Sequence, residues 1–155
     1  MQSSRERTRA IGIALLLATV AVACLPPPPA PAGHIAPIIE SIVVSPDPVT
    51  TGEPMTISVV ATDDGPVSAL TFDFNILAGP FDAGGYPGPG YTTLDAASAG
   101  CSPAAAQQIG ENRVSVTRTC TVPGGSPIGE WRSSVTVSDG VPNGATGRVF
   151  VFGVR

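Results

Sequence analysis

The sequence contains no lysine, a single histidine (His34) and three cysteines, and only 13% of its 155 residues are charged. Schiff-base chemistry and P-loop phosphate binding are excluded, because both depend on a lysine amine. One histidine removes most acid–base catalysis. The net charge of −4 argues against a nucleic-acid partner held by a basic face. We therefore expect a protein that is not an enzyme, uses no cofactor and does not bind nucleic acid.

The chain also lacks an apolar run long enough to span a membrane, which takes about 20 residues. Its longest such run covers residues 11–23, where Thr19 is the only polar residue. Three arginines, Arg5, Arg7 and Arg9, precede this run. A basic start followed by a short apolar stretch is typical of a secretory signal peptide, so residues 1–23 are predicted to be one.

The apolar stretch ends in Ala21-Val22-Ala23-Cys24. These residues resemble the lipobox of bacterial lipoproteins. The resemblance implies export, lipidation of Cys24 and anchoring to the bacterial cell envelope. Ala-Val-Ala also satisfies an ordinary signal peptidase, so simple secretion and an uncleaved anchor stay open as alternatives. Without residues 1–23 the chain keeps five arginines and eleven acids. The resulting net charge of −6 disfavours contact of the folded part with anionic lipids.

The two remaining cysteines, Cys101 and Cys120, have no other partner if Cys24 is lipidated. An exported protein folds in an oxidising compartment, where such thiols pair. We therefore predict a disulfide between them.

A proline-rich segment follows Cys24, reading LPPPPAPAG over residues 25–33. Such a run favours polyproline II and acts as a semi-rigid spacer. Residues 24–34 are thus predicted to be a linker that holds a folded domain, residues 35–155, away from the membrane. His34 at its end is predicted to be solvated.

From residue 35 the pattern changes to short β-branched and apolar runs separated by Gly, Pro, Asp and Asn, which is typical of an all-β sandwich. Strands are predicted over 38–45, 55–62, 67–76, 113–122, 130–138 and 148–154. Trp131 has the inward parity of its strand and is predicted to lie in the core. Arg118 also has inward parity, which indicates an edge or a bulge.

An irregular segment, 78–110, separates the third of these strands from the fourth. Its first part is too rich in Gly and Pro for the interior of a strand. A short strand is predicted over 91–95. Residues 102–110 begin with Ser-Pro and end with Gly, which predicts one short helix.

Two stretches resemble bacterial Ig-like domains of the PKD and cadherin-like kind. VSPDPVTTGEPMTISVVATDD (44–64) is similar to their opening strands, and GEWRSSVTVSDG (129–140) to their end. The resemblance implies a single Ig-like antiparallel β-sandwich of about seven strands, with the Gly/Pro-rich insertion between the strands predicted over 67–76 and 113–122. It also implies a domain that serves as a spacer or an adhesion module at a cell surface, and it implies no catalytic residues.

Three acids, Asp63, Asp64 and Asp139, follow two of the predicted strands. In an Ig-like topology the corresponding loops lie at the same end of the sandwich. Three carboxylates there would suit Ca²⁺. The simpler interpretation is that these aspartates close Asx-turns.

Three aromatic residues, Phe81, Tyr86 and Tyr91, lie within the Gly/Pro segment. They are interpreted either as a lid folded over an open sheet edge or as a binding loop, since rigid aromatic rings on loops supply contact area. The strand order places Phe81 and Tyr86 at the end away from the linker and the three acids near it. We expect a membrane-anchored display domain for surface structure or for recognition of a protein or glycan. The alternatives are a binding subunit of an envelope complex and a calcium-stabilised adhesion module.

Overall fold

The computed structural model describes residues 32–155; the predicted signal peptide, Cys24 and the linker up to residue 31 lie outside this range. The described part is all-β, with one short 3-10 turn, η1 (Val67–Ala69). Its strands are β1 (Ile38–Ser45), β2 (Pro54–Thr62), β3 (Thr71–Phe74), β4 (Leu77–Phe81), β5 (Pro87–Leu94), β6 (Ala105–Gly110), β7 (Arg113–Thr121), β8 (Gly129–Ser138) and β9 (Ala145–Val154). None of the described residues belongs to a helix of the length and hydrophobicity needed to cross a bilayer.

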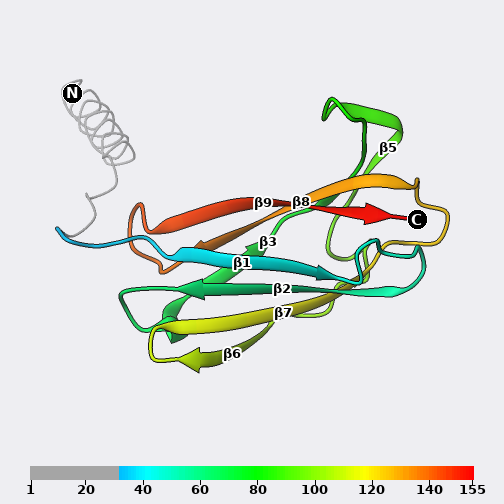
Figure 1. Ribbon diagram of the computed structural model, residues 1–155. Helices are drawn as coiled ribbons and strands as arrows, with labels where there is room; N and C mark the ends of the chain where they lie inside the picture. The colour runs from blue at the N-terminus through cyan, green and yellow to red at the C-terminus, as the bar shows by residue number, and fades with distance from the viewer. Residues whose placement is uncertain (1–31) are drawn as a thin grey trace, which may run out of the picture.

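Two antiparallel sheets form a sandwich (Figure 1). The first has the order β1-β2-β7-β6. In the second, β8 pairs with β9 over its whole length and with β3 and β4 in succession, and β5 extends the sheet beyond β4. The predicted sandwich is confirmed, with nine strands rather than about seven.

The core lies between the sheets and is built by alternating residues. Inward positions of β2, β7 and β8 are buried while their neighbours are partly or fully exposed, the period of two that a half-buried strand requires. Trp131 is fully buried in the core, as predicted, and its Nε1 donates a hydrogen bond to the main-chain oxygen of Pro127 at 3.0 Å.

The predicted helix over 102–110 is wrong, because this segment forms β6 and pairs with β7. Ser102 does not cap a helix; its main-chain N–H donates to the oxygen of Thr119 at 2.8 Å, and its hydroxyl accepts from the N–H of Thr119 at 3.1 Å. Pairing with a neighbouring strand thus overrides the local preference of an Ala-rich segment for helix.

The expectation of no strand interior in the Gly/Pro segment is also wrong. Residues 77–94 form the β4–β5 hairpin, with a register irregularity between Gly79 and Phe81 where Pro80 interrupts the pairing. The strand predicted over 91–95 is the end of β5 and lies next to β4. The strand predicted over 67–76 begins instead with the turn η1 and continues as the short β3.

Candidate recognition site

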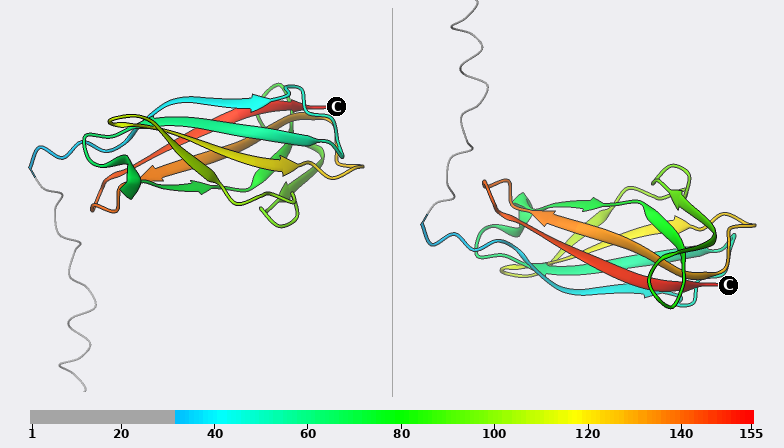
Figure 2. Two further views of the ribbon diagram at one scale, coloured as in Figure 1. Left: turned by 90° about the horizontal axis from the view of Figure 1, so that it is seen from below. Right: turned by 90° about the horizontal axis from the view of Figure 1, so that it is seen from above.

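The linker meets the sandwich at the end that holds the three predicted acids (Figure 2). His34 Nε2 lies 3.0 Å from Asp139 Oδ2, and the two side chains are only 13% and 6% exposed. The main-chain N–H of Ile35 donates to Asp64 Oδ2 at 3.4 Å. The prediction that His34 is solvated is therefore wrong, because the histidine packs against the β8–β9 loop.

Asp63 and Asp139 each accept a hydrogen bond from a main-chain N–H two residues further on. The donors are Gly65, at 3.3 Å, and Val141, at 2.8 Å. These contacts are Asx-turns, the simpler of the two interpretations of the acids. Across residues 32–155, no group of three His, Cys, Asp or Glu side chains is arranged to hold a metal ion.

The β4–β5 hairpin lies at the opposite end, beside the C-terminus (Figure 1). Its tip is held by Asp82, whose Oδ1 accepts from the main-chain N–H groups of Gly84 and Tyr86, both at 2.9 Å. Gly85 takes a positive φ of 79°, a conformation that favours glycine. The hairpin tip is thus fixed by hydrogen bonds between its main chain and Asp82.

Two of the three predicted aromatic residues pack within the molecule. The rings of Phe81 and Tyr91 meet edge to face at 5.4 Å, and the Arg132 guanidinium lies 4.3 Å from the centre of the Phe81 ring. Arg132 is held in turn by Glu130, whose Oε1 accepts from Nε and Nη2 at 2.9 and 2.7 Å. Phe81 therefore helps to fix the hairpin on β8, whereas Tyr86 is 71% exposed.

Sequence reasoning missed two exposed apolar residues at this end, Ile128 and Val151. Ile128 is 70% exposed just before β8, and Val151 pairs across the sheet with Arg132. The sequence could have indicated the exposure of Val151. Because Trp131 points inward, its neighbour Arg132 and the cross-strand partner of Arg132, Val151, lie on the outer face of the sheet. We use the name distal patch for three exposed side chains, Tyr86 of the β4–β5 hairpin, Ile128 before β8 and Val151 of β9.

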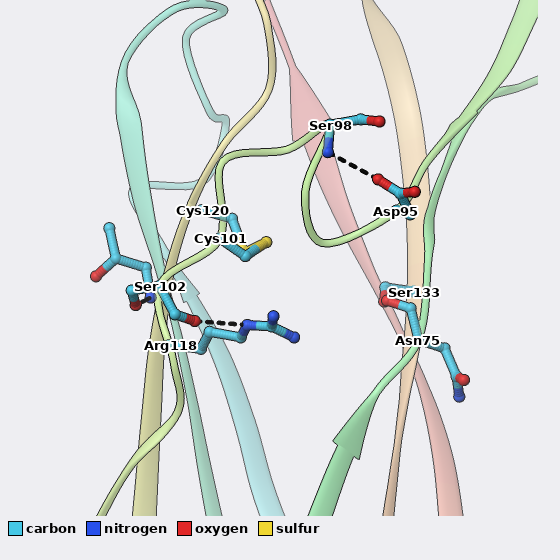
Figure 3. The surroundings of a disulfide bond; sticks show 9 residues. Asn75, Asp95, Ser98, Cys101, Ser102, Arg118, Cys120 and Ser133 are labelled. Atoms are coloured by element: carbon cyan, nitrogen blue, oxygen red, sulfur yellow. Dashed lines mark hydrogen bonds between the residues drawn. A yellow bond between two sulfur atoms is a disulfide. The ribbon is translucent and has the colours of Figure 1, made fainter.

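The predicted disulfide between Cys101 and Cys120 is confirmed (Figure 3). It joins the segment that follows β5 to the end of β7. The N–H of Thr121, beside it, donates to the oxygen of Ala99 at 2.7 Å. The turn before Cys101 is capped by Asp95, which accepts from the Ser98 N–H at 2.7 Å; this bond lowers the pKa of the Asp95 carboxyl.

Arg118 points into the space between the sheets from the middle of the first sheet. Its pairing with Ile57 of β2 is regular, so the prediction of an edge or a bulge is wrong. Its Nε donates to the oxygen of Ser102 at 2.9 Å, and its guanidinium carbon lies 5.6 Å from the centre of the Phe74 ring (Figure 3 shows the bond to Ser102). The arginine thus supports the start of the segment that leads into β6.

Comparison with models of known protein families finds no match for this chain, and comparison with curated proteins finds none either.

Proposed function

We propose that the chain is an exported protein attached to a membrane through a lipidated Cys24, and that its sandwich is a non-enzymatic domain that recognises a protein partner. One observation carries the proposal: the end where His34 contacts Asp139 and the end that carries the β4–β5 hairpin are opposite ends of the sandwich (Figure 1). A domain tethered at one end presents the other to its surroundings.

The chemistry of the distal patch favours a protein over a glycan. Ile128 and Val151 are aliphatic, and Tyr86 offers a large amphipathic ring. Exposed aliphatic side chains and an exposed tyrosine suit an apolar protein surface, since tyrosine is enriched at interfaces of this kind. The Phe81 ring carries Arg132 on its face and is less accessible for stacking against a sugar.

Two roles fit this proposal, adhesion between surfaces and membership of an envelope complex. Both require contact through the distal end, so the same experiment addresses both. A rigid hairpin tip also favours recognition, because less conformational entropy is lost on binding.

The test is site-specific photocrosslinking on intact cells that produce the full chain. A photoreactive amino acid replaces Tyr86, Ile128 or, as an exposed control on β1, Val43, which is 54% exposed. We expect adducts to the same protein from positions 86 and 128 and none from 43, and we expect Tyr86→Ala to reduce the adduct from position 128. Equal adducts from all three positions, or adducts to glycan alone, would contradict the proposal.

A further inference from the structure

A sandwich of open sheets exposes strand edges whose main-chain groups can pair with another strand. In this protein, β1 and β9 protect each other. Arg148 Nη1 donates to the main-chain oxygens of Ile39 and Glu40, at 3.3 and 3.4 Å, along the edge of β1. Near the end of β9, the N–H of Val49 donates to the oxygen of Gly153 at 2.8 Å. This side of the sandwich is therefore closed.

Two edges of the second sheet are also protected. The strand β5 carries Pro87 and Pro89, which have no N–H to donate to a further strand. The strand β3 is only four residues long and carries Asp73. Short length, proline and charge are the features that prevent edge pairing in natural sheets.

The edge of β6 has none of these protections. All six of its residues are exposed, and it pairs only with β7, at the margin of the first sheet (Figure 1). Its pairing is regular from Ala105 to Gln108, with an irregularity only at the turn end, between Gln108 and Gly110. No charged residue occurs from position 96 to position 110, and proline occurs there only at position 103, before the strand.

We propose that β6 pairs antiparallel with β6 of a second copy of this chain, which joins the two four-stranded sheets into one continuous sheet. An exposed strand edge is complementary to another strand edge, and within this protein the other edges are blocked. An antiparallel pair of identical strands has the two-fold symmetry of most homodimers. The absence of charge over 96–110 removes the like-charge repulsion that a chain of net negative charge otherwise brings to self-association.

The pairing fixes the geometry of the dimer. Because the two β6 strands run in opposite directions, the linker end of one sandwich lies beside the distal end of the other. The two linkers then leave from opposite ends, which suits copies held on two facing surfaces. The dimer itself does not depend on lipidation or on the proposed protein partner.

The test uses two charged variants of the full chain, analysed by sedimentation velocity in density-matched detergent. Ala105→Lys/Gln107→Lys and Ala105→Glu/Gln107→Glu change residues opposite Thr117 and Ser115, on the outer face of the sheet. Each variant alone places like charges across the paired strands. We expect the unsubstituted chain to dimerise and each variant to dimerise about tenfold more weakly, or worse. An equimolar mixture of the two variants restores the dimer, because lysine then faces glutamate.

A control carries a lysine on the protected edge instead, Thr93→Lys on β5, at an exposed position of that strand, and dimerises like the unsubstituted chain. Melting temperatures of all variants establish that they are folded. A monomeric unsubstituted chain overturns the proposal, as does a dimer that both β6 variants leave intact. Failure of the mixed variants to form the dimer also overturns it, because the interface then lies elsewhere.

Discussion

Single residues at the contact between β4 and β8 decide how closely the hairpin approaches the core. A Cβ atom on Gly79 would lie 2.5 Å from Cγ of Trp131, which is fully buried. A glycine in a strand interior usually weakens the strand. Here the missing side chain of Gly79 allows the main chain of β4 to lie against the indole ring of Trp131. The need for glycine at this position could not be recognised from the sequence, because Trp131 is far from Gly79 in the chain.

We expect Gly79→Ala to destabilise the domain by about 1–3 kcal/mol, the usual cost of overpacking a core. The melting temperature should fall by roughly 3–6 °C for each kcal/mol, as measured by thermal unfolding. Gly124→Ala is the matched control, because nothing lies within 4 Å of its added methyl group and its φ is not positive. Equal melting temperatures for the two variants would show that Trp131 does not restrict position 79.

The disulfide acts at a single pair of residues but holds a long segment. The bond joins Cys101 and Cys120, which are 19 positions apart in the sequence, and the loop it closes contains β6. A loop of this size stabilises a fold by about 3 kcal/mol in the chain-entropy description. We expect Cys101→Ala/Cys120→Ala to lower the melting temperature by on the order of 10 °C. An unchanged melting temperature would mean that β6 holds its place without the bond.

At the scale of elements, the sequence predicted β1, β2, β7 and β8 within a residue at each end, because alternating apolar residues define them. It placed β9 three residues too late and failed between residues 77 and 110. Gly79 and Pro80 are unfavourable in strands, and their role depends on Trp131, which is distant in sequence. The Ser-Pro start of 102–110 resembles a helix, but the disulfide and the bonds of Ser102 to Thr119 hold it beside β7.

The β4–β5 hairpin carries two aromatic residues with different roles, Phe81 in packing and Tyr86 at the surface. Phe81 contacts Tyr91 and Arg132, whereas Tyr86 is exposed. We expect Phe81→Ala to lower the melting temperature by several degrees and Tyr86→Ala to leave it unchanged, because surface changes usually stay within about 0.5 kcal/mol. Thermal unfolding of the two single variants checks this difference. A large loss of stability in Tyr86→Ala would mean that the tyrosine also closes the hairpin.

At the scale of the whole molecule, the sandwich has two distinct ends. The contact of His34 with Asp139 fixes where the linker arrives. The order of strands predicted that the acids lie at this end and that Phe81 and Tyr86 lie at the other. In the structure Asp139 contacts His34, and the β4–β5 hairpin that carries Phe81 and Tyr86 lies at the opposite end (Figure 2). The chain reverses direction between β1 and β2 and between β8 and β9, whereas β3 and β4 both pair antiparallel with β8 and run in the same direction.

The membrane attachment we propose rests on one side chain, and we expect Cys24→Ser to move the protein from the membrane fraction to the soluble fraction. A serine cannot carry the thioether-linked lipid implied by the lipobox resemblance, and several buried acyl chains are what make such anchoring stable. Immunoblots of fractionated cells measure the distribution. Retention of the variant in the membrane would contradict attachment through Cys24.

The intact mass of the protein extracted from membranes tests the membrane attachment most directly. We expect a chain that begins at Cys24, lacks residues 1–23 and carries the added mass of acyl chains on that residue. We also expect two hydrogens fewer for the disulfide between Cys101 and Cys120. A mass that corresponds to the full 155 residues, or to a cleaved chain with an unmodified Cys24, would rule out attachment through a lipidated Cys24.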